Sequence, residues 1–249
     1  MRWLPYLLTV ACLGGAWKVL SLLLGSSMLP APEAAGGAFF LALGTKAFWG
    51  HFGASAWRAG AAMAAAWLVA FPLGVAMGGS KRLDAALGPL VFLTYPIPKI
   101  VLLPLAFLLF GLGDASKIVM IALILGYQVL VTTRDGVLAV HPKHLDAIRS
   151  LGASRLQVAT EVLIPAALPH GFTALRLNAG VSVAVLFFVE SFATQTGLGY
   201  LIMDAWGRLD YVSMFIGIFG MSLLGVVLYE TANLLERHAC AWKGAGARR

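Results

Sequence analysis

Long apolar runs separated by short polar segments dominate this chain of 249 residues. A helix that crosses a membrane needs about 20 mostly apolar residues, because in hydrocarbon every backbone amide must find its partner within the helix. Six runs approach or exceed that length: residues 6–24, 59–77, 87–110, 116–131, 173–192 and 212–229. The pattern therefore predicts an all-α transmembrane protein with six spans, forming a single membrane domain over residues 1–249.

The third run contains Pro96, Pro98 and Pro104, each of which removes a helical hydrogen bond. We therefore expect the segment TYPIPK, residues 94–99, to break the helix. An interfacial or re-entrant piece would precede it, and the true span would follow it. Broken backbone at membrane depth is tolerated only where protein or a water-filled cavity surrounds it.

The segment from residue 142 to residue 165 is more polar and still has helical periodicity. Pro142 suits a first helical turn, and Gly152 is typical of a residue that ends a helix. Ser154 followed by Gln157 is a capping-box pattern, which predicts a second helix that Pro165 would close. The expected structure is a short helix, a tight corner and another short helix. From periodicity alone, this hairpin could equally lie on the inner leaflet as an amphipathic surface.

Composition and charge place the whole chain in a membrane. Hydrophobic residues make up 60% of the chain and charged residues only 12%, far from the proportions of soluble domains. Lysine and arginine accumulate in cytoplasmic loops. With the N-terminus inside, the inner segments hold Arg2, Lys81, Arg82, Arg134, Lys143, Arg149, Arg155, Arg176, Arg237, Lys243, Arg248 and Arg249, whereas the outer ones hold Lys46, Arg58, Lys117 and Arg208. Both termini are thus expected in the cytoplasm.

The net charge of +7 follows from this topology and does not indicate nucleic-acid binding. An alternative for the run 6–24 is a cleaved signal peptide, but its apolar core exceeds the usual 7–15 residues. We therefore expect a retained first span.

Motifs for catalysis or cofactor binding are absent from the sequence. The two cysteines, Cys12 and Cys240, are too few and too badly placed for a disulfide framework. The segment GLGDASK at Gly111 lacks the glycine spacing of a phosphate loop, and the five histidines form no H-E-x-x-H pair. No G-x-S-x-G nucleophile elbow occurs. We expect neither an enzyme nor a cofactor or metal in this chain.

The polar segment has a spacing that narrows its interpretation. Asp146 and Ala147 are followed by Gly152 and, after nine intervening residues, by Val162, Leu163, Ile164 and Pro165. This pattern closely resembles the EAA loop of ATP-binding cassette (ABC) importer permeases, EAA-x3-G-x9-I-x-L-P. The chain departs from it in four places: Asp146 stands for Glu, Ile148 for the second Ala, Val162 for Ile and Ile164 for Leu.

The resemblance extends over about residues 54–242, with a core permease domain at 54–236. The matching pieces are SAWRAG at Ser55, PLGVAMG at Pro72, YPIPKIVLLPLAFLLFGLGDASK at Tyr95, IPAALPHGFTALRL at Ile164 and ESFATQTGLGYLIMDAW at Glu190. They are similar to the branch of these permeases that serves nitrate, aliphatic sulfonates, taurine and thiamine-precursor pyrimidines.

The resemblance implies a six-span permease of the type I, MetI-like class in the bacterial inner membrane, working as a homodimer. Two cytoplasmic ATPase subunits would bind ATP and Mg²⁺, and an extracytoplasmic substrate-binding protein would deliver the cargo, a small anion or related molecule. Residues 142–165 would then be the coupling loop that contacts the ATPase. Its contact residues would be Asp146, Ala147, Arg149, Leu151, Gly152, Ala153, Ser154, Arg155 and Pro165.

The translocation pathway is expected near Glu190, Ser191, Lys99 and Tyr95. Glu190 stands about 21 Å beyond Arg176 along a helix, which is about two-thirds of the way across a ~30 Å core. It has two readings: a gate or polar network beside the pathway, or a hydrogen-bond acceptor that stabilises packing at the outer end of the helix. Lys99 could attract anionic cargo or extend to the inner headgroups. The segment 197–206 is expected to form an outer-face helix that meets the binding protein.

Two rival functions remain compatible with a six-span chain. A secondary transporter would need an ion-coupling site and often has an internal repeat, neither of which is visible in the sequence, and it would leave the EAA-like loop unexplained. The other rival is a structural membrane subunit or a membrane enzyme.

Overall fold

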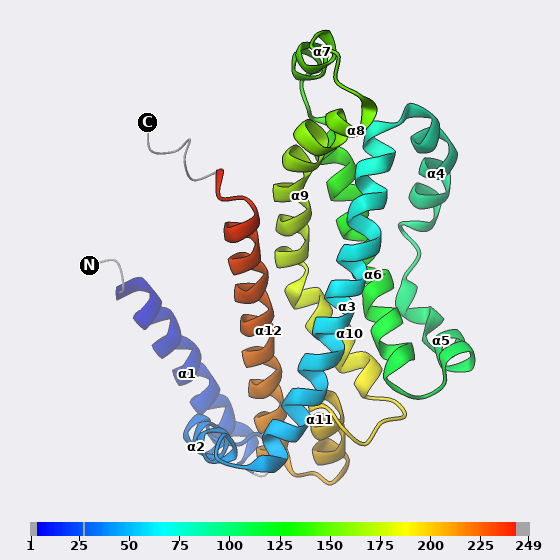
Figure 1. Ribbon diagram of the computed structural model, residues 1–249. Coiled ribbons are helices and arrows are strands. Elements are labelled where there is room, and N and C mark those ends of the chain that lie inside the picture. The colour runs from blue at the N-terminus through cyan, green and yellow to red at the C-terminus, as the bar shows by residue number, and fades with distance from the viewer. Residues whose placement is uncertain (1–3, 27, 243–249) are drawn as a thin grey trace. The chain divides into compact units, whose positions relative to one another are not determined.

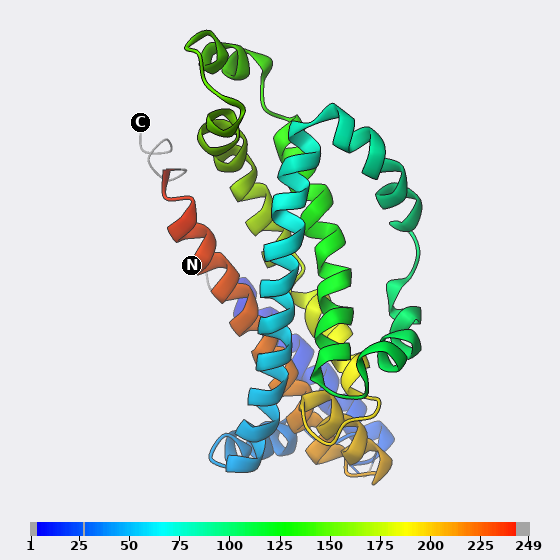
Figure 2. The ribbon, with the colours of Figure 1, turned by 45° about the vertical axis from the view of Figure 1, so that its right-hand side comes forward.

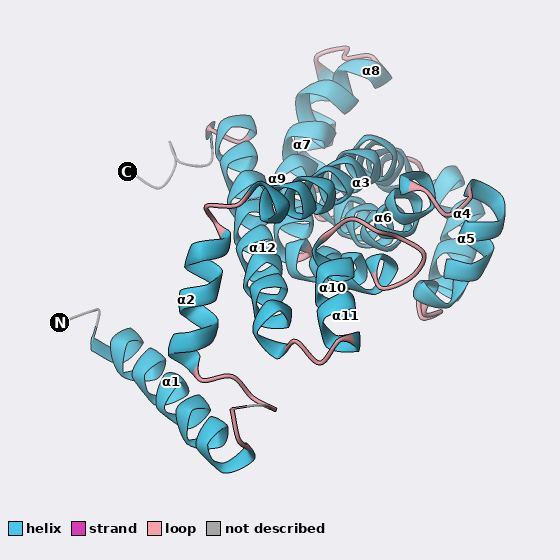
Figure 3. Cartoon of the chain, turned by 90° about the horizontal axis from the view of Figure 1, so that it is seen from below, coloured by secondary structure: helices cyan, strands magenta, loops and turns pink. Residues whose placement is uncertain are grey.

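The computed structural model describes residues 4–26 and 28–242, and every regular element in these ranges is helical (Figure 3). The positively charged residues Arg2, Lys243, Arg248 and Arg249, which entered the topology prediction, lie outside the described ranges. The chain divides into two compact units: residues 1–56 with 190–224, and residues 57–189 with 225–249. Helices α3 and α12 each contribute to both units.

The first unit contains α1 (Leu4–Leu24), α2 (Pro32–Ala42), the start of α3 (Lys46–Gly79), α11 (Leu198–Gly207) and the start of α12 (Tyr211–Ala239). Aromatic rings hold these helices together: the Trp17 ring stacks on Phe215 at a centroid distance of 5.0 Å. At the start of α12, the Asp210 carboxylate accepts a hydrogen bond from the Ser213 backbone N–H (3.1 Å). Hydrogen bonding from Ser213 lowers the pKa of Asp210, as is usual for a carboxylate that caps a helix.

The second unit contains the rest of α3 and α12 and all the helices between α3 and α11. These are α4 (Lys81–Thr94), the 3-10 turn η1 (Lys99–Leu102), α5 (Leu103–Phe110), α6 (Asp114–Leu138), α7 (Pro142–Ser150), α8 (Arg155–Val158), the π-turn η2 (Ala159–Leu163), α9 (Ile164–Leu177) and α10 (Ala179–Glu190). Helices α3, α6 and α9 run side by side through this unit, as Figures 1 and 2 show from two directions.

Small residues let these helices approach closely, as is common where helices pack within a membrane. A Cβ atom added to Gly74 of α3 would lie 2.7 Å from the Leu130 carbonyl oxygen of α6. One added to Gly136 of α6 would lie 2.6 Å from the His170 ring of α9. Substituting either glycine would therefore force the two backbones apart.

Four helices are long and apolar enough to cross a membrane among the described residues: Lys46–Gly79, Asp114–Leu138, Arg155–Leu177 and Tyr211–Ala239. The pair Lys81–Thr94 and Lys99–Phe110 passes the same test together, with a bend of 88°. Two shorter apolar helices, Leu8–Leu24 and Ala179–Glu190, complete the set. The protein is a multi-helix membrane protein, as the apolar runs predicted.

The break at residues 94–99 is confirmed, because α4 ends at Thr94 and the next helical turn begins at Lys99. The prediction of a full span after the break is wrong, since η1 and α5 end at Phe110 and pass the length test only together with α4. The bounds of four other spans were predicted wrongly. The second, fourth and sixth runs, 59–77, 116–131 and 212–229, are the apolar parts of longer helices, Lys46–Gly79, Asp114–Leu138 and Tyr211–Ala239, whose ends carry polar and charged residues. The fifth run, 173–192, is not one helix: α9 ends at Leu177 and α10 begins at Ala179. The side-chain amide of Asn178 donates to the Ala174 carbonyl at this junction (2.7 Å).

Candidate functional site

The segment with the EAA-like spacing folds into a helical elbow, which we define as residues 142–163 (α7, α8 and η2). It projects from one end of the second unit (Figure 1). Pro142 lies in the first turn of α7, as predicted. The side chain of His141 caps this helix by accepting a hydrogen bond from the Lys143 N–H (3.2 Å).

Gly152 forms the corner of the elbow with a positive φ of 82°. The Gly152 N–H donates to the Arg149 carbonyl (2.9 Å), and the Ala153 N–H donates to the Ile148 carbonyl (3.3 Å). These two bonds define a Schellman motif, in which a left-handed residue satisfies the last carbonyls of a helix. The prediction that Gly152 ends the first helix is confirmed.

The second arm of the elbow begins with the predicted capping box. The Gln157 N–H donates to the Ser154 hydroxyl (3.3 Å), and the Ser154 N–H donates to the Gln157 side-chain oxygen (2.8 Å). These bonds satisfy two backbone donors that the helix itself leaves unpaired.

The prediction that Pro165 ends this second helix is wrong. Helix runs without a break from Arg155 to Leu177, and Pro165 lies in the first turn of α9. The reason is the π-turn η2, in which the Ile164 N–H donates to the Ala159 carbonyl five residues earlier. A widened turn keeps the proline ring away from the carbonyl that a regular α-helix would push against it. The elbow is therefore joined directly to α9.

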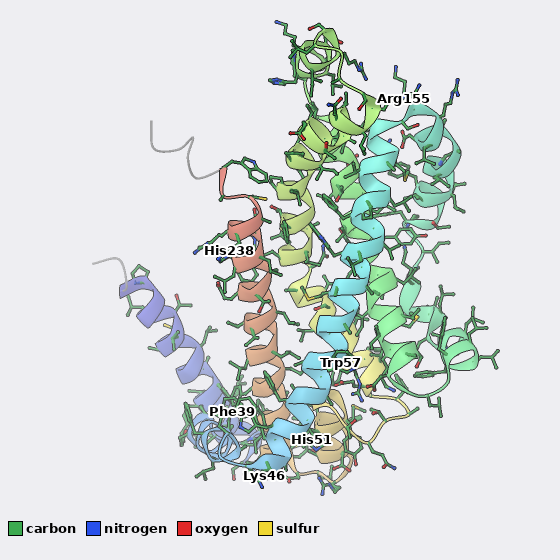
Figure 4. All side chains as sticks on the ribbon, in the orientation of Figure 1. Phe39, Lys46, His51, Trp57, Arg155 and His238 are labelled. Atoms are coloured by element: carbon green, nitrogen blue, oxygen red, sulfur yellow. The ribbon has the colours of Figure 1, made fainter. Side chains whose placement is uncertain are left out.

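The outer surface of the elbow is available for contact. Leu151 at the corner is 87% exposed. The charged side chains Asp146, Arg149 and Arg155 are also exposed, and none of them forms an ion pair with a described residue. Figure 4 labels Arg155, the first residue of α8 in the elbow, at this end of the second unit. The elbow thus carries an exposed apolar side chain at its corner, with exposed charges beside it.

The broken backbone at residues 94–99 holds Lys99 in a turned-back position. The Lys99 ammonium donates to the carbonyls of Thr94 (3.0 Å), Tyr95 (2.9 Å) and Ile97 (3.3 Å). It also lies 3.9 Å from the centroid of the Tyr127 ring. Lys99 thus caps α4 and satisfies carbonyls that the break leaves without helical partners.

A cavity of about 360 Å³ adjoins this break, lined in part by Tyr95, Lys99, Tyr127 and Gln128. Polar groups beside a broken membrane helix are the usual surroundings of a transported solute. Tyr95 and Lys99 accordingly stay candidates for the pathway.

Glu190 is 1% exposed and belongs to a hydrogen-bond network within the first unit. Its carboxylate accepts from the Ser55 hydroxyl (2.8 Å) and from the Gly199 N–H (2.9 Å). The Leu198 N–H donates to the Ser55 oxygen (2.8 Å). The carboxylate therefore anchors the first turn of α11. Of the two roles left open by the sequence, these contacts favour the packing role. Ser191 follows it, half-buried, at the end of α10.

Gly197 completes this network. Its φ is 116°, and a Cβ atom at this position would lie 2.4 Å from the Glu190 carboxylate. Its N–H donates to Nδ1 of His51 (3.2 Å). No local pattern indicates the bond between Ser55 and Glu190 or the bond between His51 and Gly197, because the partners are 135 and 146 residues apart along the chain. The motif pieces SAWRAG and ESFATQTGLGYLIMDAW contained the only available signal.

Three ion pairs in the second unit were also missed: Arg58 with Asp114, Arg134 with Asp84, and Arg176 with Glu236. Each joins residues at least 50 positions apart, so no local pattern indicates it. Trp67 packs between helices, as its ring stacks on Phe172 of α9 at 4.2 Å.

The helical spans and the projecting elbow place the chain in the class of multi-helix membrane proteins with a projecting helical loop. The chain belongs to the family of binding-protein-dependent transport system inner membrane components, whose model matches residues 70–239. It is thus a multi-pass inner-membrane permease subunit of an ABC importer. It is not itself an enzyme: ATP is bound by a partner ATPase, and a substrate-binding protein is a further component of such a system.

Relatives match nearly the whole chain. The taurine transport system permease protein TauC of Escherichia coli (strain K12) is 34% identical over 92% of this chain and 85% of its own length. A protein of Bacillus subtilis (strain 168) named as the aliphatic sulfonates transport permease SsuC is 29% identical over 98% of this chain and 89% of its own. The riboflavin transport system permease protein RibX of Chloroflexus aurantiacus is 30% identical over 88% of this chain and 81% of its own.

Proposed function

We propose that this permease carries a small organic anion of the taurine or aliphatic-sulfonate type into the cytoplasm. The similarity to TauC and SsuC over nearly the whole chain supports this cargo. The similarity to RibX makes a heterocycle such as riboflavin the main competitor. Nitrate, which the sequence resemblance also suggested, is a smaller anion with the charge of a single sulfonate group.

The helical elbow is the coupling loop in this proposal. The contact residues are Asp146, Ala147, Arg149, Leu151, Gly152, Ala153, Ser154, Arg155 and Pro165. Exposed Leu151 and half-buried Ala153 would fill a groove on the ATPase, while Asp146, Arg149 and Arg155 would pair with charges at its rim. The helix runs without a break from α8 through η2 into α9, so movement of the ATPase would be passed directly to the membrane helix.

The proposed topology has six crossings and both termini in the cytoplasm. The crossings are α1, α3, the bent pair α4 and α5, α6, α9 continued by α10, and α12. This arrangement brings the elbow and the basic corner between α3 and α4 to the cytoplasmic side, in agreement with the positive-inside rule. We further propose a homodimer of permeases above two ATPase subunits. The cargo would pass near Tyr95, Lys99, Glu190 and Ser191.

Co-purification and cargo competition test this proposal. The permease, expressed with the ATPase and binding-protein genes that accompany it, is expected to copurify with the ATPase. Uptake of labelled taurine should then be inhibited by an excess of aliphatic sulfonate and not by riboflavin. Inhibition by riboflavin alone would replace the proposed cargo. Absence of the ATPase from the purified complex, even in mild detergent, would argue against the elbow as its contact.

A further inference from the structure

A basic cavity lies beside the elbow at the end of α3. It has a volume of about 610 Å³ and is lined by Lys81 and Arg82 of α4 and by Arg149 and Arg155 of the elbow. No carboxylate is among its lining residues in the described part of the chain. None of the four cations forms an ion pair with a described residue, whereas Arg134 nearby is paired with Asp84. The cavity therefore concentrates uncompensated positive charge.

An apolar groove of about 340 Å³ continues from this cavity and shares Gly79, Ser80, Arg155 and Leu163 with it. One wall is the α3 segment from Phe71 to Gly79, which is about 12 Å long at 1.5 Å per residue. The other wall comes from η2 and α9. Pro72 and Ala76 are exposed along the groove. A charged mouth thus opens into an apolar channel along a membrane helix.

We propose that an anionic phospholipid occupies these two spaces, with its phosphate among the four cations and one acyl chain in the groove. Basic pockets beside membrane helices on the cytoplasmic side recognise anionic headgroups, and apolar grooves bind hydrocarbon. A free phosphate, or an acidic side chain of a partner, would satisfy the cations and leave the groove empty. The inference rests on the proposed function in one respect, which is the cytoplasmic placement of the elbow.

The bound lipid has a consequence for coupling. Its phosphate would connect Lys81 and Arg82, at the corner between α3 and α4, with Arg149 and Arg155 on the elbow. Each guanidinium has five N–H donors, so a contact with the phosphate leaves donors for the rim of the ATPase. Because these cations repel one another when no anion is present, an anionic lipid would hold the elbow against the corner. The proposed role is to stabilise one position of the elbow relative to α3.

Lipid binding to the purified permease tests the headgroup site. Native mass spectrometry would follow titration with phosphatidylglycerol and with phosphatidylcholine of identical acyl chains. The double variant Lys81→Gln/Arg82→Gln should weaken phosphatidylglycerol binding by roughly ten- to thirtyfold, as expected for the loss of two interfacial cations. The matched control Lys143→Gln/Arg237→Gln loses the same charge at exposed positions outside the cavity and should change binding less than about threefold. Equal effects of the two double variants would overturn the proposal.

A second variant distinguishes a lipid from a free anion. Ala76→Phe places a ring in the groove from an exposed position and should also weaken phosphatidylglycerol binding, while millimolar inorganic phosphate should not displace the lipid. Displacement by phosphate with no effect of Ala76→Phe would show an anion site only. Loss of the ATPase from the Lys81→Gln/Arg82→Gln complex with unchanged lipid binding would show a protein contact. Either result overturns the proposal.

Lipid binding by native mass spectrometry is measured without transport, so failure of the lipid site and failure of the proposed function can be told apart. If ATP-driven uptake is observed but lipid binding shows no charge selectivity, this inference alone fails. If phosphatidylglycerol binds as described but uptake does not depend on ATP, the proposed function fails and the lipid site stands.

Discussion

Two glycines with positive φ form the turns on which both candidate regions depend. Gly152 makes the corner of the elbow, and Gly197 precedes α11 in the Glu190 network. They differ in their surroundings: a Cβ atom at Gly152 would meet nothing within 4 Å, whereas one at Gly197 would meet the Glu190 carboxylate. Substitution at Gly152 is therefore a matter of backbone conformation, and substitution at Gly197 adds a steric clash.

Replacing Gly152 should damage coupling more than removing a neighbouring charge. A side chain in the left-handed region costs about 1–2 kcal/mol, so Gly152→Asp is expected to distort the corner. Rim charges usually contribute less, and Arg149→Ala should have a smaller effect. The measurement is substrate-stimulated ATPase activity of the purified complex. A matched control is Gly180→Ala, which also meets open space but has no positive φ. Full stimulation in the Gly152→Asp complex would contradict the assignment.

Gly197→Ala should destabilise the protein by about 2 kcal/mol or more, because backbone strain and overpacking act together. The expected sign is a lower thermal unfolding midpoint, with faster amide exchange in α11. Gly207→Ala in the same helix, where an added Cβ meets nothing within 4 Å, should be neutral. Equal midpoints for the two variants would show that the Glu190 network does not anchor α11.

Among individual residues, those that act on neighbours along the chain could be predicted from the sequence. Gly152, Ser154 and Pro142 act within four positions of their partners, so capping and turn chemistry revealed them. Glu190 was recognised only as a costly buried carboxylate, because its donor Ser55 is 135 residues away. For Lys99 the sequence left two readings, attraction of anionic cargo or extension to the inner headgroups, and neither included the carbonyls freed by the break, which bind its ammonium.

Among the elements, the π-turn η2 is the feature that connects the elbow to the membrane. It contains one residue more than an α-helical turn would use, and it lies directly before Pro165. Periodicity in the sequence could not reveal it, because a single inserted residue shifts the pattern no more than ordinary variation does. The proline was therefore predicted to end the helix. The break at 94–99 was predictable because two prolines lie in six residues.

Deleting Thr160 should remove the extra residue of η2. The turn would tighten toward α-helix, and the elbow would rotate by about 100° relative to α9, which is the rotation of one helical residue. We expect the folded permease to remain, with loss of the complex with the ATPase or of stimulated ATP hydrolysis. The substitution Thr160→Ala keeps the residue count and removes only the hydroxyl, which contacts the Leu156 carbonyl (3.1 Å), the Gln157 carbonyl (3.4 Å) and the Glu161 carboxylate (3.3 Å), so it serves as the control. Normal coupling in the deletion variant would show that the orientation of the elbow is not set by η2.

For the whole molecule, composition and charge predicted the membrane class and the expected orientation. The six apolar runs correspond to helices or to parts of helices, although three helices continue past their apolar runs and the fifth run is interrupted at Asn178. The family match over residues 70–239 adds the identity of an importer permease. The cargo depends on a separate binding protein, so this chain carries little direct information about it.

The most direct test of the account is the energy source of uptake. The permease would be reconstituted in vesicles with its ATPase and its binding protein. Transport of labelled taurine would be followed with and without ATP on the side of the membrane where the ATPase lies. The account predicts uptake that requires ATP and binding protein, continues when ionophores collapse proton and sodium gradients, and is lost in an assembled Gly152→Asp complex. Uptake that follows an ion gradient and ignores ATP would contradict it.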